Sequence, residues 1–201
     1  TAYVLLVGTG TVKIVDNSKR FEDVTDNAWF KGAVDFASSH ELFRGISETE
    51  FGPGLNMTRA MMATVFYRLE GEPLVGGSTA FKDVESGTWY SDAVKWANDV
   101  GIVQGYDDET FGTEDSITRE QMAVMFYRYA KYAGLDTTAS KSLSSFPDGG
   151  EVSSWAQEAM SWCAAVGLFK GDDTGALNPT NNATRAEVAT LFMRMVELMV
   201  K

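Results

Sequence analysis

The run Phe81-Lys82-Asp83-Val84 returns twice elsewhere in the chain, as Phe21-Glu22-Asp23-Val24 near the start and as the shortened Phe146-Pro147-Asp148 in the last third. A tryptophan follows each run, and each copy closes with a threonine–arginine pair. Both features shift by 60 residues between the first and second copies (29 to 89, 59 to 119) and by 66 between the second and third (89 to 155, 119 to 185). So many matching positions indicate an internal repeat. The tryptophans are Trp29, Trp89 and Trp155, and the pairs are Thr58-Arg59, Thr118-Arg119 and Thr184-Arg185.

Each copy predicts two helices around a glycine-bounded loop. In the second copy, apolar or small side chains recur at spacings that trace one face of a helix: Trp89, Ala93, Trp96, Ala97 and Val100. A second such face follows the threonine–arginine pair: Met122, Met125, Phe126 and Tyr129. The loops between the helices begin at Gly45, Gly105 and Gly171, and their glycines suit tight turns. The predicted fold class is therefore mainly α, with three helix-loop-helix repeats.

The repeats are predicted to span residues 21–70, 81–133 and 146–201. The linker of residues 71–80 contains Pro73 and the pair Gly76-Gly77, and that of residues 134–145 is rich in serine and threonine. Residues 1–20 do not repeat. Residues 3–7 and 11–15 resemble short strands, so this stub is predicted to be the remnant of a preceding domain. Because no copy can bury its apolar helix faces alone, we expect the three to pack as one domain.

The composition excludes several classes of partner. The chain has 201 residues, is 44% hydrophobic and carries a formal net charge of -11. Such a charge repels nucleic acid and anionic lipid, so neither is an expected partner. The apolar stretch of residues 4–7 is too short to span a bilayer, which argues against membrane insertion. A single cysteine allows no intrachain disulfide framework.

The sequence offers no recognisable catalytic or metal-binding constellation. The sole histidine, His40, aligns with Val100 and Val166 on the packing side of a helix, and Cys163 aligns with alanines at a small core position. The acidic residues 107–109 align with Ser-Glu-Thr in the first copy and lack EF-hand spacing. We therefore expect no catalytic residue, no metal and no cofactor. A glycoside hydrolase that uses paired carboxylates is the weakest alternative, since no carboxylate pairing recurs across the copies.

The tryptophans are interpreted first as core residues. Trp96 and Trp162 lie on the apolar helix faces and are predicted to be buried. Core packing is also favoured for Trp29, Trp89 and Trp155 at the helix starts, over a role as platforms for sugar rings.

The threonine–arginine pairs carry the strongest functional signal. Thr184 and Glu187 fit a capping box, the second copy keeps it with Gln121, and Met61 breaks it in the first copy. The arginine stands in the first helical turn, where the helix dipole disfavours a cation. Two readings stay open. A structural partner such as Asp23, Asp83 or Asp148 could compensate the charge, or each arginine could join free helix-start amides to hold an anion, which we favour. The second reading predicts that removing the arginine costs binding and hardly any stability.

The combination of Phe-x-Asp-Val, the following tryptophan, the glycine-bounded loop and Thr-Arg-Ala-Glu resembles the S-layer homology domain, in three copies over about residues 21–201. The resemblance implies one pseudo-threefold, spindle-like helical domain with grooves between repeats. It also implies non-covalent binding to secondary cell wall polysaccharide, often pyruvylated on N-acetylmannosamine. Such a module is non-catalytic, lies outside the cell at the bacterial surface or wall, and anchors a fused upstream cargo.

The resemblance also implies which residues bind the polysaccharide. Arg59, Arg119 and Arg185 would hold the carboxylate of the glycan, and the helix-start tryptophans and loop glycines would shape the grooves. The expected site comprises these arginines with Trp29, Trp89, Trp155, Asp23, Asp83, Asp148, Gly45, Gly105 and Gly171. Two departures, Met61 for the usual glutamate and the missing valine after Asp148, predict unequal grooves. A protein-interaction scaffold within a surface layer is the alternative function.

Overall fold

The computed structural model describes residues 17–200. This part of the chain holds six α-helices and two 3-10 turns: α1 (Lys31–Ser39), α2 (Arg59–Leu69), α3 (Ser91–Asp99), α4 (Arg119–Tyr132), η1 (Leu143–Ser145), η2 (Gly149–Glu151), α5 (Gln157–Ala165) and α6 (Arg185–Met199). The fold is mainly α, as the periodicity predicted. The two expected strands of the stub, residues 3–7 and 11–15, lie outside the described residues.

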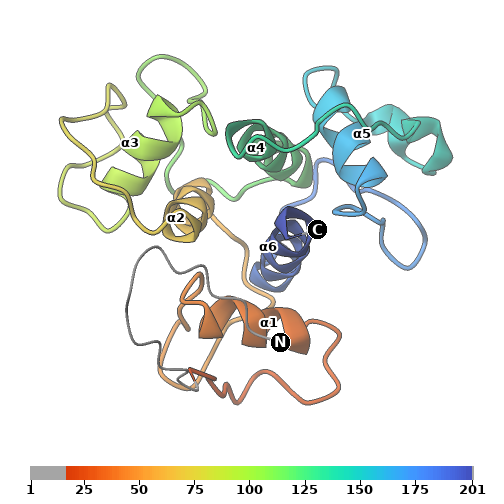
Figure 1. Cartoon of the computed structure of the whole chain (residues 1–201), viewed down its shortest axis with the longest axis horizontal. Coiled ribbons are helices and arrows are strands. Elements are labelled where there is room, and N and C mark those ends of the chain that lie inside the picture. Colours follow the sequence, from red (N-terminus) through yellow and green to blue (C-terminus); the bar gives the residue numbers. More distant parts are fainter. Residues whose placement is uncertain (1–16, 201) are drawn as a thin grey trace, which may run out of the picture.

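The second helix of each repeat lies at the centre of the molecule. Figure 1 shows α2, α4 and α6 grouped in the middle, with α1, α3 and α5 around them. Phe66, Phe126 and Phe192, one from each inner helix, are fully buried and touch pairwise, with ring centroids 4.8–5.2 Å apart. These rings stand at equivalent positions of the three copies, so their cluster marks the pseudo-threefold axis. Such aromatic contacts add to the stabilisation from apolar burial.

The segments that lead into the inner helices close a ring of backbone hydrogen bonds. Met57 N–H donates to the Ala183 carbonyl, Ala183 N–H to the Ile117 carbonyl, and Ile117 N–H to the Met57 carbonyl, each at 2.9 Å. Isolated antiparallel bridges accompany them: Asn56 with Thr184, Thr58 with Ser116, and Thr118 with Asn182. Buried backbone groups of all three copies are thereby satisfied by one another.

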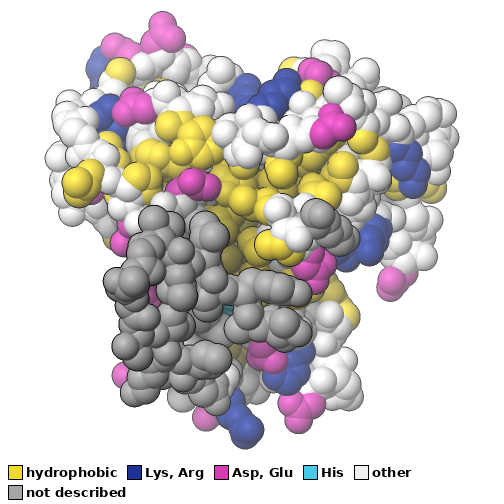
Figure 2. Space-filling model, viewed as in Figure 1, with side chains coloured by type: hydrophobic (Ala, Val, Ile, Leu, Met, Phe, Trp, Pro, Cys, Tyr) yellow, Lys and Arg dark blue, Asp and Glu magenta, His cyan; other side chains and the backbone are white. Residues whose placement is uncertain are grey.

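Each outer helix packs on the inner helix of the preceding copy. α3 packs on α2, α5 on α4, and α1 on α6. The first and last repeats therefore meet and close the ring, which supports the expectation of one domain. Figure 2 shows apolar side chains gathered over the inner helices on this face, with charged side chains mostly toward the rim.

The predicted core is confirmed for Trp96 and Trp162, which are buried beside Tyr67 and Tyr127 respectively. Core packing is wrong for the other tryptophans, because Trp29, Trp89 and Trp155 are 69%, 58% and 58% exposed. Each of these precedes its helix by two residues, so the apolar helix face does not include it.

The single cysteine and the single histidine of the chain differ in burial. Cys163 is buried, as predicted, and desolvation raises the pKa of its thiol. His40 is exposed, so its predicted place on the packing side is wrong. It ends α1, and its ring lies over Phe36 with centroids 4.2 Å apart. Among residues 17–200, no helix is long and apolar enough to cross a membrane.

Candidate groove site

Each inner helix begins with the arginine of a threonine–arginine pair, and the arginine reaches into the loop of the next copy. Arg59 donates from Nε to the Phe111 carbonyl (2.9 Å) and from Nη2 to the Gln104 carbonyl (2.7 Å). Arg185 repeats this pattern on the Phe51 carbonyl (2.8 Å) and the Arg44 carbonyl (2.7 Å). Arg59 and Arg185 are also buried. The hydrogen bonds and the burial together hold both guanidinium groups in place.

Arg119 has a different second partner. Its Nε donates to the Leu177 carbonyl (2.6 Å), as in the other copies, but its Nη1 donates to Glu187 Oε1 at 2.8 Å. This ion pair joins the second and third copies, and both side chains are largely shielded, at 12% and 31% exposure. The three arginines are therefore equivalent in position and unequal in charge compensation.

Aromatic rings also lie close to each guanidinium. Arg59 Cζ lies 4.6 Å from the centroid of Tyr106, and Arg185 Cζ lies 4.7 Å from that of Phe51. Arg119 Cζ lies 5.3 Å from the centroid of Phe169. Burial lowers the pKa of Arg59 and of Arg185. Both stay charged, because arginine is not deprotonated in proteins.

Neither sequence-based account of these arginines matches the hydrogen bonds. The helix-start amides are not free: Arg59 N–H and Ala60 N–H donate to carbonyls of Asp115 and Thr113, and the other two inner helices repeat this. The expected anion site on free amides is therefore wrong. Because buried carbonyls would lose their donors, these bonds predict a loss of stability on arginine removal, in contrast to the expectation from the sequence.

The aspartates do not pair with the arginines; they bind loop backbone. Asp83 accepts from the N–H groups of Phe111 (2.8 Å) and Gly112 (2.6 Å). Asp23 and Asp148 do the same at the equivalent places, with Phe51 and Gly52, and with Leu177 and Asn178. Desolvation opposes ionisation of Asp83, but the N–H donors outweigh it and lower its pKa. Each aspartate thus holds the loop whose carbonyl meets the arginine.

The capping residues follow the sequence prediction. Thr118 and Gln121 form a capping box in α4, and Thr184 and Glu187 form one in α6. In α2, the Thr58 side chain accepts from Met61 N–H, but the Met61 side chain does not complete a capping box with the Thr58 N–H.

Two of the arginines open into grooves that all three copies build. The Arg59 groove, of about 420 Å³, is lined by that arginine, by loop and α4 residues of the second copy, and by Trp155 of the third: Arg59, Gln104, Gly105, Tyr106, Gln121, Val124, Met125, Arg128 and Trp155. The exposed tryptophan therefore joins an arginine from a copy that is not its own.

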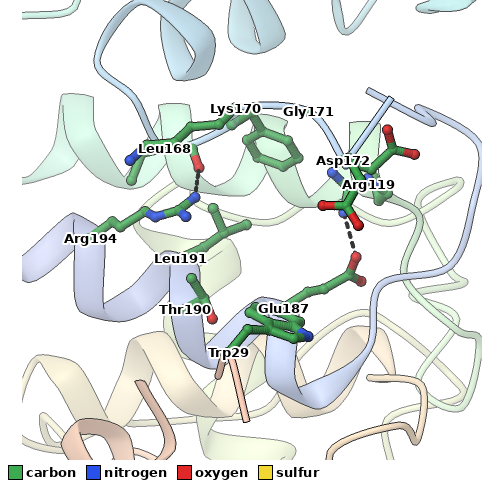
Figure 3. Close-up of a pocket in the computed structure, with 12 residues that line it drawn as sticks. Trp29, Arg119, Leu168, Lys170, Gly171, Asp172, Glu187, Thr190, Leu191 and Arg194 are labelled. Carbon is green, nitrogen blue, oxygen red and sulfur yellow. Dashed lines mark hydrogen bonds and ion pairs between the residues drawn. The ribbon is translucent and has the colours of Figure 1, made fainter. Parts of the chain in front are cut away.

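The Arg119 groove, of about 530 Å³, has the same plan. Its lining includes Arg119 of the second copy, Gly171 and Glu187 of the third, and Trp29 of the first. Figure 3 shows Arg119 and Glu187 joined in this groove, and Arg194 bonded to the Leu168 carbonyl (2.7 Å). The structure thus brings together arginine, glycine and tryptophan in two grooves. Asp23, Asp83 and Asp148 are not among the described residues that line either groove, and they bind the loop backbone instead.

The third set of predicted residues is not gathered in one cavity. Gly45 and Arg44 line a hollow of about 540 Å³ with Phe43 and Lys19, and neither Arg185 nor Trp89 is among the described residues that line it. The loop glycines have a steric role as well. A Cβ on Gly105 would lie 2.5 Å from the Asp107 carbonyl oxygen, and Gly45 and Gly171 are similarly crowded.

Sequence reasoning missed a second arginine at each groove. Arg68, Arg128 and Arg194 recur with the offsets of the repeat (68 to 128, 128 to 194). Arg128 Nη2 donates to the Gln104 side chain (2.7 Å), and Arg128 and Arg194 line the two grooves. Their shared offset was the signal that could have identified them.

One known protein family matches the three repeats of the chain. The model of the S-layer homology domain matches residues 20–63, 80–123 and 145–189, which are the three repeats. The chain belongs to the S-layer homology family. The match confirms the resemblance and the tandem repeats. Domains of this family are non-catalytic anchoring modules, and the chain is an extracellular module of the cell surface that anchors to the cell wall.

Several longer proteins contain a similar stretch. The chain is 31% identical to an amylopullulanase of Thermoanaerobacterium thermosulfurigenes over 89% of its length, which is 10% of that protein. It is 27% identical to a surface-layer 125 kDa protein of Lysinibacillus sphaericus over 98% of its length, 16% of that protein. A cellulosome-anchoring protein of Acetivibrio thermocellus is 30% identical over 56% of the chain, 26% of that protein. The chain therefore spans about a quarter or less of each of these relatives.

Proposed function

We propose that the chain binds an acidic secondary cell wall polysaccharide, such as a pyruvylated one, in the Arg59 and Arg119 grooves and at the equivalent Arg185 position. The observation that carries the proposal is the shared construction of the two grooves. Each takes a fixed arginine from one copy, a loop and helix face from the next, and an exposed tryptophan from the remaining copy. Such a groove combines a cation with an apolar ring, and these two surfaces complement the carboxylate and the apolar face of an acidic sugar.

The arginine is suited to a carboxylate ligand. Among the described residues, Arg59 uses Nε and Nη2 for its carbonyl bonds, and its guanidinium lines the groove. Arginine has five N–H donors in a planar fork, so donors remain for a carboxylate. The protein bonds hold the fork in place before binding, which reduces the entropy lost on association. Asp83 contributes indirectly, by holding the loop that supplies the Phe111 carbonyl.

The exposed tryptophans supply the second half of the site. Trp155 and Trp29 are too exposed to stabilise a core, and each lies in a groove with an arginine. In this proposal their rings pack against the apolar faces of sugar units. Binding in several grooves along one polymer would raise the overall avidity and secure a fused upstream cargo to the wall.

A sedimentation experiment with purified cell walls tests the proposal. The full chain is mixed with walls before and after chemical extraction of the secondary polysaccharide, and the pelleted fraction is measured. We expect the chain to pellet with intact walls, to stay in solution with extracted walls, and to be released by the soluble polysaccharide. Equal pelleting with both preparations would rule out the polysaccharide as ligand.

The alternative is a scaffold for other surface proteins. The exposed tryptophans are the observation that favours it, because protein interfaces are enriched in tryptophan. In that case the chain would pellet with extracted walls that retain surface proteins. Protease treatment of the walls would then abolish binding, whereas it leaves polysaccharide binding intact.

A further inference from the structure

The two grooves carry different charge. The Arg59 groove is lined by two cationic side chains, Arg59 and Arg128, and by no carboxylate among the described residues. The Arg119 groove is lined by three cationic side chains, Arg119, Lys170 and Arg194, and by three carboxylates, Asp172, Asp173 and Glu187. An acidic chain with a formal net charge of -11 thus has one groove that is locally positive and one that is locally neutral.

The difference centres on the third position of the inner helix. Glu187 stands there in α6, and its two oxygens have separate roles: Oε2 accepts from Thr184 N–H at 2.9 Å and Oε1 accepts from Arg119 at 2.8 Å. In α4 the position holds Gln121, whose Oε1 accepts from Thr118 N–H at 3.2 Å. Both residues cap their helix. The glutamate in addition supplies a counter-ion to the arginine, which the uncharged amide cannot do.

The first copy has no carboxylate at this position either, because Met61 stands there. The arginine that reaches this copy is Arg185, whose Nη2 donates to the Arg44 carbonyl. Arg68 of α2, equivalent to the groove residue Arg128, adds a further positive charge that acts on Arg185. Asp23 acts on Arg185 in the opposite sense, and Arg185 is not among the described residues that line the hollow beside Gly45, so the comparison is confined to the two grooves.

We propose that the third residue of α4 and of α6 selects the ligand of its groove. The Arg59 groove takes the anionic units of the polymer, and the Arg119 groove, neutralised by Glu187, takes its uncharged sugar units. This inference rests on the proposed function, since it assigns parts of the same polysaccharide to different grooves. An anion that approaches Arg119 meets a carboxylate already bonded to it, in a partly desolvated place where like charges repel strongly.

Reciprocal substitutions test the proposal without disturbing the helix caps. Gln121→Glu and Glu187→Gln each introduce a residue that already forms a capping box in the other helix. Calorimetric titration with a synthetic pyruvylated N-acetylmannosamine glycoside counts the anion sites, and the same glycoside without the ketal is the neutral probe. Glu114→Gln, which removes an exposed carboxylate outside both grooves, is the control.

In the two grooves we expect one anion site per wild-type chain, two in Glu187→Gln and none in Gln121→Glu. The altered site should change its affinity for the anionic probe by roughly tenfold or more, since one full charge is gained or lost beside the arginine. The neutral probe should be affected much less, and Glu114→Gln should match the wild type. Wild-type binding that neither exchange alters would overturn the selection by residues 121 and 187 and leave the polysaccharide function standing. If the wild-type chain bound neither the probe nor the purified polymer, this inference and the proposed function would both be overturned.

Discussion

Phe66 and Phe192 lie in contact, with ring centroids 4.8 Å apart, although one comes from the first copy and the other from the third. Both are fully buried, and Phe126 of the second copy touches each of them. The centre of the molecule is therefore a joint product of the three repeats. No single copy can retain this contact, and neither can any pair of copies retain all of it.

This arrangement predicts that the repeats unfold together. A fragment of residues 78–201 lacks α1, which packs on α6, and α2, which packs on α3. We expect it to give no sharp melting transition by calorimetry or circular dichroism. In the full chain, Phe192→Ala should cost about 3–5 kcal/mol of unfolding free energy, and Phe192→Leu clearly less. A full-strength transition in the fragment would contradict the single-domain account.

The buried arginines predict a loss of stability and of binding together. Arg59→Ala removes the donors of two hydrogen bonds to carbonyls, so the unfolding free energy should fall by about 1.5–3 kcal/mol. Binding to wall polysaccharide should weaken by roughly tenfold or more. Arg59→Lys keeps the charge and loses the planar fork, so it should restore both only in part. Urea denaturation and wall sedimentation measure the two effects.

Lys82→Ala is the matched control for the arginine variants, because Lys82 is an exposed cation outside both grooves. We expect it to change neither property appreciably. Loss of stability in Arg59→Ala with binding kept in the folded fraction would assign the arginine to the fold alone.

The exposed tryptophans predict a loss of binding with little loss of stability. Trp155 is 58% exposed and lines the Arg59 groove, so Trp155→Ala should hardly change the melting temperature. Its affinity for the polysaccharide should fall by roughly tenfold, since a large aromatic ring leaves the site. Trp162→Ala supplies the contrast, because it empties a buried place and should cost about 3–5 kcal/mol of stability. Unchanged binding in Trp155→Ala would remove this residue from the site.

Local features of the fold could be predicted from the sequence. The repeats, the helix faces and the capping boxes at Thr118 and Thr184 depend on residues a few positions apart, and the spacing of those residues is visible in the chain. The partner of Arg59 could not be predicted in this way. Its bonds to Gln104 and Phe111 depend on which copy lies beside which, and identical repeats give no indication of that choice.

The exposed tryptophans were mispredicted for a related reason. A residue that stands just before a helix has no fixed place on the helix face, so the period that identified Trp96 does not apply to Trp89. The grouping of Trp155 with Arg59 likewise needs the pseudo-threefold arrangement of all three copies.

Asp83 predicts a dependence of stability on pH. Its carboxylate accepts from backbone N–H groups of residues 111–113, which hold its pKa below the ordinary value. A depressed folded-state pKa adds stability that is complete above the unfolded pKa of about 3.9 and is lost as the pH falls through the folded-state value. Asp83→Asn should therefore lower stability at pH 7 and flatten its decline in acid, as followed by urea denaturation at several pH values. Asp108→Asn, at an exposed loop position, is the control and should hardly change the stability at pH 7.

Gly105 predicts a steric requirement of the groove loop. A Cβ at this position would lie 2.5 Å from the carbonyl oxygens of Asp107 and Thr110, so Gly105→Ala must shift the loop backbone. We expect a stability loss of about 1–3 kcal/mol. Binding in the Arg59 groove should weaken as well, because Gln104 and Tyr106 move with the loop.

Gly76→Ala is the matched control, since a Cβ at Gly76 has nothing within 4 Å. It should change stability by no more than about 0.5–1 kcal/mol, in the stabilising direction if at all. Equal melting temperatures for the two variants would show that the loop accommodates a side chain at residue 105 and would remove Gly105 from the residues that shape the groove.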